Sequence, residues 1–229
     1  MKLFDWLRRP KDQTDYAALA RTSGDPFRVS DYFAAAEPAT ADCWNKMIWP
    51  VIGRHRANMN FSSVVDLAAG HGRNSEMLKT FCDRITCVDI NGECIEACKA
   101  RFAGDSRFSF VQNDGFSLQP IAAGSVTFLF SFDAMVHFDP EVVKNYVPEM
   151  ARVLAPGGHG FVHHSNYTAN AGGDFRHSPH WRNYMSRELF TGYCKRAGLD
   201  IVESEVIDWG GGADFYAGLD CLTLFRKPA

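Results

Sequence analysis

The 229-residue chain is long enough to bury a full hydrophobic core, and a single domain is the natural expectation for this length. Hydrophobic residues make up 46% and charged residues 22% of the chain, which is typical of a globular protein. The net charge of −3 does not favour nucleic acid as the main partner, because phosphate binding usually leaves a basic excess. No apolar run reaches the ~20 residues that span a bilayer.

The first ten residues would place Leu3, Phe4 and Leu7 on one side of a helix. We favour a helix packed on the domain over one that binds a membrane surface or a partner. Asp5 interrupts the apolar stretch, which is too short for a secretory signal. The seven cysteines show no CxxC spacing of the kind that binds zinc, so we expect buried free thiols in a reducing cytoplasm.

Mixed helical signals run through residues 1–62, where residues 39–56 predict a helix with Thr40 as N-cap and a kink near Pro50. From residue 63 onward, short β-branched runs alternate with helical stretches. The predicted strands are residues 63–67, 85–89, 108–112, 125–130, 160–164, 201–207 and 221–225. The predicted helices are residues 74–82, 91–102, 140–154 and 186–197.

This alternation predicts an α/β fold with a mostly parallel sheet and helices on both faces. We expect a helical extension over residues 1–62, followed by one compact sheet domain over residues 63–229. In such a sheet, ligands bind beyond the carboxyl ends of the strands, near the point where the strand order reverses.

Unusual residues follow each of the first four predicted strands. Gly70 and Gly72 come after the first strand, and their missing Cβ atoms let the backbone turn sharply and approach a ligand closely. Asp89 ends the second strand, where a carboxylate can accept two hydrogen bonds from a ribose diol. Residues 113–116 offer polar and apolar side chains suited to the edge and face of an adenine, and residues 131–133 follow the fourth strand.

The stretch VVDLAAGHGRNS resembles the first motif of class I S-adenosylmethionine-dependent methyltransferases, which follows the first strand with an acidic-x-Gly-x-Gly-x-Gly pattern. Ala68 stands where the first glycine of that pattern usually lies. The resemblance extends through Asp89, Asp114 and the Leu-Ala-Pro-Gly-Gly turn at 154–158, and covers roughly residues 60–165. It implies a seven-stranded Rossmann-like sheet whose last strand is antiparallel, with S-adenosyl-L-methionine as the cofactor.

The resemblance also implies which residues contact that cofactor. The glycine loop would lie under the methionine portion, Asp89 would hold the ribose, Ile90 would pack on the adenine and Asp114 would receive the adenine amino group. The implied cofactor-binding set is Asp66, Ala68, Gly70, Gly72, Asp89, Ile90, Asp114, Gly115, Phe116, Ser131 and Phe132.

A nicotinamide dinucleotide site shares the strand–glycine turn–helix arrangement, but its GxGxxG fingerprint is incomplete here. Ser75 stands at the third glycine position, and a pyrophosphate would lie close to the carboxylate of Asp66. A purely structural role explains each turn residue by itself. It does not explain why acidic residues follow three consecutive strands.

Histidines gather after the fourth and fifth predicted strands, where a base would take a proton from a hydroxyl acceptor. His163 and His164 are adjacent on a strand and face opposite sides, so at most one of them is expected in the pocket. We favour His164 as the catalytic residue, with His163 as the alternative. For His137 a catalytic and a structural role carry equal weight. A polar loop at 172–181 is expected to line or cover the acceptor pocket.

We expect no metal centre, because Asp133, Asp139 and Asp174 are too scattered in the sequence to form a magnesium site. The glycine-rich loop at 209–216 is equally consistent with a surface connection and with an acceptor contact.

The segments FVHHSN and HSPHWRNYMS resemble methyltransferases of bacterial sugar and polysaccharide modification. Aromatic faces pack on sugar rings while His, Asn and Asp bond their hydroxyls. We therefore predict a cytoplasmic enzyme that methylates a small polar acceptor at a hydroxyl of a sugar or related metabolite. The alternatives are N- or C-methylation of another metabolite, and a cofactor-binding protein without catalysis. We expect neither a nucleic-acid partner nor a transmembrane segment, and the oligomeric state stays open.

Overall fold

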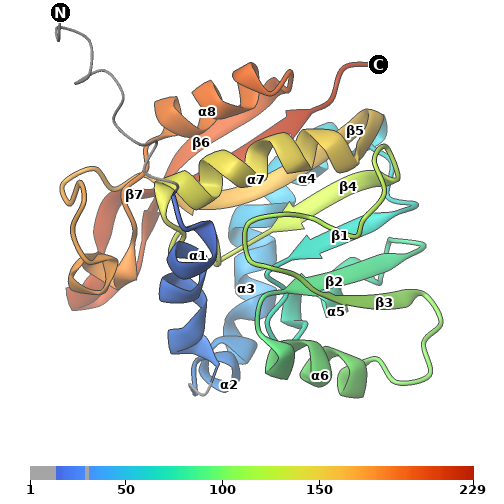
Figure 1. The fold of residues 1–229 in the computed structure, drawn as a ribbon, viewed down its shortest axis with the longest axis horizontal. Helices are drawn as coiled ribbons and strands as arrows, with labels where there is room; N and C mark the ends of the chain where they lie inside the picture. Colours follow the sequence, from blue (N-terminus) through green and yellow to red (C-terminus); the bar gives the residue numbers. More distant parts are fainter. Residues whose placement is uncertain (1–13, 29–30) are drawn as a thin grey trace, which may run out of the picture.

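The computed structural model describes residues 14–28 and 31–229, so the helix predicted over residues 1–10 lies outside the described residues. Within the described part, seven strands form one sheet in the order β3-β2-β1-β4-β5-β7-β6 (Figure 1). The first five strands are parallel, and β7 runs antiparallel to both β5 and β6. The predicted α/β fold with a seven-stranded, mostly parallel sheet is therefore confirmed. The strands are β1 (Val64–Leu67), β2 (Ile85–Asp89), β3 (Phe108–Gln112), β4 (Val126–Ser131), β5 (Leu154–Ser165), β6 (Asp200–Trp209) and β7 (Tyr216–Arg226).

Helices cover both faces of the sheet (Figure 1). One face carries α7 (Pro140–Val153) and α8 (Arg187–Arg196), and the other carries α5 (Arg73–Leu78), α6 (Gly92–Arg101) and the end of the N-terminal helical region. The central strand β4 is almost entirely buried because it is covered on both faces, which accounts for its apolar sequence.

Among the strands, β5 differs most in length from its prediction, because it begins at Leu154 directly after α7. The Ala-Pro-Gly-Gly stretch that was expected to be a turn before the strand forms a bulge within it, where Gly157 has a φ of 77° and the register against β4 shifts. Its backbone pairs with the chain beyond β7, since the N–H of Gly157 donates to the carbonyl of Lys227 and the N–H of Lys227 donates to the carbonyl of Gly158. The proline and the two glycines thus follow the end of the helix, as predicted, and form a bulge in the strand.

The N-terminal region is helical and comprises α1 (Tyr16–Gly24), η2 (Asp25–Phe27), α2 (Tyr32–Ala36), η3 (Glu37–Ala39), α3 (Thr40–Cys43), η4 (Trp44–Ile48), α4 (Trp49–His55) and η5 (Arg56–Asn58). Trp44 anchors this region on the sheet domain. Its ring stacks on Phe130 of β4 with centroids 5.4 Å apart, and its Nε1–H donates to Oδ1 of Asn74 at 3.0 Å.

Two details of the predicted helix over residues 39–56 are corrected. Thr40 has helical backbone angles and continues a preceding turn, so it is not the N-cap. Near Pro50, where a kink was expected, the helix widens into a π-helical turn, η4, which ends at Ile48. Pro50 has no N–H to donate to the carbonyl four residues earlier. Because this helical hydrogen bond is absent, the backbone can adopt the wider turn.

In Figure 1 the N-terminal helices α1 and α2 lie at the edge of the sheet where the arrowheads of β1, β2 and β4 end. This is the edge at which ligands bind in parallel sheets. No helix in the described ranges, 14–28 and 31–229, is long and apolar enough to cross a membrane.

Candidate active site

A pocket opens at the carboxyl ends of β1, β2 and β4, where the order of the sheet reverses between β1 and β4. Its empty volume is about 900 Å³, including the open solvent at its mouth. The walls come from the loops after these strands and from α1, η2 and α2. The residues of the predicted site that line it are Ala68, Gly70, Asp89, Ile90, Gly115, Phe132 and His137.

The glycine loop after β1 owes its shape to residues in left-handed backbone conformations. Gly70 has a φ of 55°, and a Cβ added there would lie 2.4 Å from the ring of Phe33. Ala68 has a φ of 58° although it carries a side chain, which costs about 1–2 kcal/mol. The backbone therefore adopts a glycine-like conformation at the position where the first glycine of the motif is replaced by alanine.

Asp89 fixes this loop from the neighbouring strand. Its buried carboxylate accepts hydrogen bonds from the backbone N–H of Gly70 and from that of Asn91, both at 2.9 Å. Burial raises the pKa of Asp89 to about 6, against the effect of these hydrogen bonds. Because each carboxylate oxygen has a further lone pair, the group can still accept a bond from a ligand in the pocket.

Asp66 and Gly72 support the glycine loop without lining the pocket. Oδ2 of Asp66 accepts a hydrogen bond from the hydroxyl of Ser75 at 2.6 Å, inside the domain. Burial raises the pKa of Asp66 to about 7. Gly72 begins α5 with a φ of 80°, and a Cβ there would lie 2.7 Å from the ring of Phe102.

The loop after β3 divides between the pocket and the surface. Gly115 lines the pocket with a φ of 84°, and a Cβ there would lie 2.3 Å from Ile90. The carboxylate of Asp114 is instead exposed and accepts from the backbone N–H groups of Phe116 and Ser117, so it caps its own turn. Phe116 also lies outside the pocket lining. Asp114 and Phe116 thus lie outside the lining of this pocket, and Asp114 borders a second hollow together with Ile90.

A compact charged group borders the pocket after β4. The carboxylate of Asp133 accepts a hydrogen bond from Nη2 of Arg73 at 2.7 Å and another from the hydroxyl of Tyr32. Burial, reinforced by the charge of Asp133, raises the pKa of Tyr32, so its hydroxyl stays protonated. Phe132 lies next to this group in the pocket wall, whereas Ser131 is buried behind it.

His137 lines the pocket with a defined protonation pattern. Its Nδ1 lies 2.8 Å from the backbone carbonyl of Trp181, and a carbonyl can only accept, so Nδ1 carries the hydrogen. Its Nε2 has no hydrogen-bond partner among residues 14–28 and 31–229. Burial and the charge of Arg182 lower the pKa of His137 to about 4, and the ring is therefore neutral near pH 7.

His164 lies away from the pocket, on the face of the sheet that α8 covers. Its ring stacks on Phe190 with centroids 4.1 Å apart. Nδ1–H donates to the carbonyl of Ser165, and Nε2 accepts from the hydroxyl of Thr223, each at 2.9 Å. Burial lowers the pKa of His164 to about 4. The expected position near the pocket mouth is not the observed one, and both ring nitrogens are used in the core.

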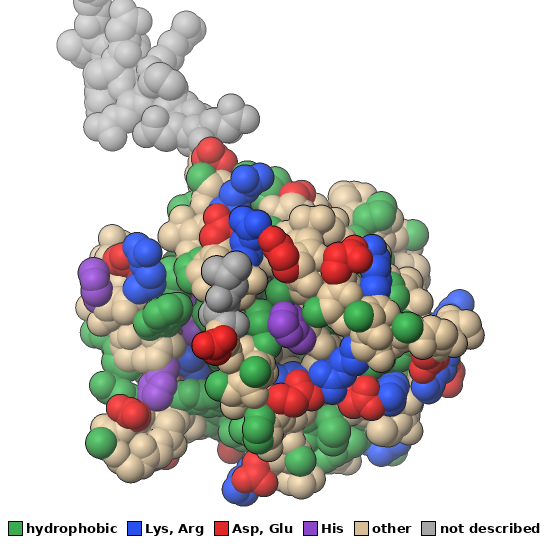
Figure 2. All heavy atoms as spheres, turned by 90° about the horizontal axis from the view of Figure 1, so that it is seen from below, with side chains coloured by type: hydrophobic (Ala, Val, Ile, Leu, Met, Phe, Trp, Pro, Cys, Tyr) green, Lys and Arg blue, Asp and Glu red, His purple; other side chains and the backbone are tan. Residues whose placement is uncertain are grey.

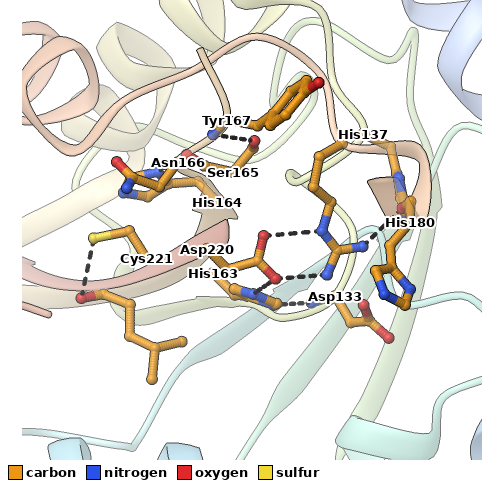
Figure 3. A network of polar contacts seen from close by, with 12 residues as sticks. Asp133, His137, His163, His164, Ser165, Asn166, Tyr167, His180, Asp220 and Cys221 are labelled. Atoms are coloured by element: carbon orange, nitrogen blue, oxygen red, sulfur yellow. Dashed lines mark hydrogen bonds and ion pairs between the residues drawn. The ribbon is translucent and has the colours of Figure 1, made fainter. Parts of the chain in front are cut away.

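His163 faces the other way, toward the back of the pocket wall, and also does not line the pocket. Its ring stacks under Phe132, with centroids 4.7 Å apart. Figure 3 shows it between Asp133 and Asp220.

The loop at 172–181, which includes η6 (Phe175–His177) and η7 (Pro179–Trp181), supports the pocket from outside. None of its residues lines the pocket. Trp181 contacts the lining residue Phe27 with ring centroids 5.8 Å apart, and its carbonyl receives the His137 hydrogen bond. His180 donates from Nε2 to the carbonyl of Asp214, so this loop packs on the loop between β6 and β7, which contains η8 (Gly212–Asp214).

The N-terminal wall of the pocket was not predicted from the sequence. This wall consists of side chains and backbone from the four helical segments α1, η2, α2 and η3, which contribute Ala20, Ser23, Gly24, Phe27, Tyr32, Phe33 and Glu37. The clustering of aromatic residues around Phe33 was visible in the sequence, but no strand end or glycine turn marked these positions as a site. The ring of Phe33 stacks on His71 with centroids 4.0 Å apart, which closes the wall against the glycine loop.

Charges on the face seen in Figure 2 are mixed, and acidic and basic side chains lie next to one another without a large area of one sign. Ion pairs such as Arg28–Glu93 and Arg101–Glu37 contribute to this mixture on the surface. Within residues 14–28 and 31–229, no three His, Cys, Asp or Glu side chains gather as metal ligands would.

Comparison with known proteins agrees with this architecture. Residues 64–158 match a family described as a methyltransferase domain. The chain is 32% identical over 98 residues to methyltransferase nsrG of Aspergillus novofumigatus, and 28% identical over 148 residues to demethylmenaquinone methyltransferase of Clavibacter sepedonicus. These alignments cover 43% and 62% of this chain. They span only 37% and 58% of the two relatives, which is less than two thirds of either.

Solved structures share the fold at low sequence identity. A candidate sarcosine dimethylglycine methyltransferase from Galdieria sulphuraria has a TM-score of 0.62 and 17% identity, over 78% of this chain and 83% of that one. The [4+2]-cyclase SpnF has a TM-score of 0.60 and 17% identity, over 88% of this chain and 84% of that one. Residues 64–158 thus resemble a methyltransferase domain, and the sheet with its helices has the fold of these solved structures.

Proposed function

We propose that this chain transfers the methyl group of S-adenosylmethionine to a hydroxyl group of a small polar acceptor. The observation that carries the proposal is the buried carboxylate of Asp89, which lines the pocket and holds the glycine loop at Gly70. A buried carboxylate without a cationic partner costs free energy. A ribose diol is a chemically suitable hydrogen-bond partner for its remaining lone pairs. The cyclase SpnF shares the fold, so the fold by itself does not define the reaction.

The lining residues suit the parts of the cofactor in order along the pocket. Ile90 and Gly115 offer an apolar, close-fitting surface for the adenine, next to the ribose partner Asp89. Gly70 and the loop after β4 would border the methionine end. Asp114 and Phe116 are not assigned to the cofactor in this arrangement, because the first caps its own turn and the ring of the second packs on Tyr16.

S-adenosylmethionine supplies a methyl group on a sulfonium, which an acceptor displaces in line when it is held close and aligned. We assign the base to His137, because its Nδ1–H is used by Trp181 and its Nε2 lone pair is left for the acceptor. As the new oxygen–methyl bond forms and the sulfur–methyl bond breaks, Nε2 would take the hydroxyl proton. A positioned base of this kind contributes about 10²–10⁴-fold in rate.

A sugar or a related hydroxyl compound remains the proposed acceptor. Phe27, Phe33 and Phe132 offer ring faces on which a sugar can pack, and Asp133 and Tyr32 border the same pocket with polar groups. This pairing of aromatic faces and hydrogen-bonding groups supports a compact polyhydroxyl acceptor. The proposal concerns this chain's pocket and not the whole length of its longer relatives.

Two measurements test the proposal. Calorimetry with S-adenosylmethionine and S-adenosylhomocysteine should show binding of both to the purified protein. An acceptor screen with isotope-labelled cofactor, read by mass shift, should return a product with one added methyl on oxygen. A product methylated on nitrogen or carbon would replace the hydroxyl assignment, binding without any product would favour a non-catalytic cofactor-binding protein, and no binding would overturn the proposal.

A further inference from the structure

A chain of buried polar contacts begins at the pocket wall and runs into the interior (Figure 3). The backbone N–H of Asp133 donates to Nδ1 of His163 at 3.1 Å. Nε2 of His163 lies 3.0 Å from Oδ2 of Asp220, and Asp220 receives two hydrogen bonds from Arg182 at 2.9 and 2.6 Å. The side chains of His163 and Asp220 are 0% exposed and that of Arg182 is 3% exposed.

The contacts fix the protonation pattern of His163. Nδ1 accepts a hydrogen bond from a backbone N–H and therefore carries no hydrogen in the neutral ring. The hydrogen is then on Nε2, which lies 3.0 Å from Oδ2 of Asp220 in a close electrostatic contact that is not aligned as a hydrogen bond. Burial would raise the pKa of Asp220, but His163 and Arg182 together hold it well below its usual range, so the carboxylate stays ionised.

Stability alone does not explain this arrangement. A buried ion pair costs several kcal/mol of desolvation per ion, and well-packed apolar residues are often equally stable. Arg182 is additionally held by the ring of Trp209, 4.7 Å from its guanidinium carbon, and by the carbonyl of His180 at 3.0 Å. Three polar side chains, one each from β5, β7 and the loop before α8, are thus held in one fixed arrangement behind the pocket.

That geometry acts on Phe132 and Asp133, two of the residues that line the pocket after β4. Asp133 has a φ of 58°, a left-handed conformation that is unfavourable for a residue with a side chain. His163 satisfies the N–H of this strained residue and stacks under the ring of Phe132 with centroids 4.7 Å apart. The carboxylate of Asp133 in turn orders Arg73 and Tyr32 on the pocket side.

We propose that His163, oriented by Asp220 and Arg182, is a positioning residue that holds Phe132 and Asp133 in the conformation that receives the methionine end of the cofactor. It acts through the loop after β4 and does not itself touch the ligand. The identity of the ligand rests on the proposed function, whereas the control of Asp133 by His163 does not.

The test compares two adjacent, equally buried histidines. His163→Leu removes the acceptor of the Asp133 N–H, and His164→Leu removes a ring of the same size that contacts only the core. His163→Asn places an amide oxygen near the position of Nδ1 and should restore the bond. S-adenosylhomocysteine affinity is measured by calorimetry for each variant, with circular dichroism to establish that it is folded.

We expect His163→Leu to weaken S-adenosylhomocysteine binding about tenfold, His163→Asn to stay within about threefold of the wild type, and His164→Leu to bind as the wild type does, since a broken buried hydrogen bond costs about 1–3 kcal/mol. If His163→Leu does not fold, His163→Gln replaces it, because its longer side chain reaches toward Asp220 rather than the Asp133 N–H. Equal losses in the His163 and His164 variants, or none in either, would overturn the proposal.

Hydrogen exchange of the Asp133 amide in the ligand-free protein gives a readout that does not depend on the cofactor. This amide should exchange about tenfold faster in His163→Leu and remain protected in His163→Asn and His164→Leu. Should the wild type fail to bind S-adenosylhomocysteine, the proposed function fails, yet this exchange pattern still decides whether His163 controls the loop. Unchanged exchange in His163→Leu would reject that control.

Discussion

The carboxylate of Asp89 and the backbone N–H of Gly70 are 2.9 Å apart and form a hydrogen bond that joins the end of β2 to the loop after β1. A single side chain therefore shapes the glycine loop and faces the pocket. We expect Asp89→Asn to weaken S-adenosylmethionine binding at least tenfold, since hydrogen bonds to a charged group contribute about 1.5–3 kcal/mol. Calorimetry provides the measurement.

Asp114→Asn is the matched control for that experiment. It removes the same charge from the next loop, but an asparagine can still accept from the N–H groups that Asp114 caps. Its cofactor affinity should remain within about threefold of the wild type. A loss as large as that of Asp89→Asn would restore Asp114 to the cofactor contacts.

His137→Asn tests the assignment of the base. The asparagine amide can keep the hydrogen bond to the Trp181 carbonyl while the Nε2 lone pair is lost. We expect turnover on the screened acceptor to fall about 100-fold or more with cofactor affinity unchanged. His164→Asn, in contrast, should retain turnover wherever the protein folds, because both nitrogens of His164 bond within the core. Loss of turnover in His164→Asn alone would reverse the assignment.

The acid side of the pH–rate profile should also test whether His137 is the base. Because burial lowers the pKa of His137 to about 4, the ring is neutral throughout the range from pH 5.5 to 8. Protonation of this base should therefore not reduce turnover in that range. An acid limb near the ordinary histidine pKa of about 6.5 would show that another group acts as the base.

Ala68→Gly should stabilise the protein. The left-handed conformation costs alanine about 1–2 kcal/mol, and the greater freedom of glycine in the unfolded chain offsets about 0.5–1 kcal/mol of the relief. The expected net gain is about 0.5–1 kcal/mol in the free energy of unfolding, measured by chemical denaturation. Gly70→Ala should do the opposite, because its Cβ would lie 2.4 Å from the Phe33 ring. A destabilised Ala68→Gly variant would contradict the strain at this position.

Asp66 should make stability depend on pH in a defined direction. Burial raises its pKa to about 7 in the folded state, whereas the unfolded carboxyl titrates near 4. The folded state binds the extra proton between these values, so this contribution is fully present below about pH 4 and is lost as pH rises to about 7. Unfolding titrations at pH 5 and pH 8 should show a larger loss of stability in the wild type than in Asp66→Asn. Contributions from groups distant from Asp66 are common to both proteins and cancel, whereas Asp89 interacts with the charge of Asp66 and contributes to the difference.

The sequence was sufficient to predict the sheet, because buried parallel strands leave short β-branched runs between amphipathic helices. The sequence also predicted Asp89 and Gly70 as site residues, because the local chemistry at strand ends requires a carboxylate and a glycine there. Asp114 shows the limit of that reasoning. A carboxylate after a strand can cap the turn that it begins, and the sequence pattern is the same in either case.

The part of the pocket wall formed by Phe27, Tyr32 and Phe33 could not be predicted in this way, for another reason. These residues reach the pocket because Trp44 docks the N-terminal helices on β4, and no local pattern encodes that long-range contact. The two adjacent histidines illustrate the same point. Alternation along β5 predicted that they would face opposite sides, but their roles depend on partners in β7, about 60 residues away, at Asp220 and Thr223.

The position of β7 constrains the order in which the molecule can be completed. Although it is the last strand along the chain, it lies between β5 and β6 and is the only neighbour of β6 in the sheet of the described residues. It also carries Asp220, the counter-ion behind the pocket wall. During synthesis, the loop after β4 would therefore stay without its inner support until β7 has been inserted, and ligand capture should emerge only after that step.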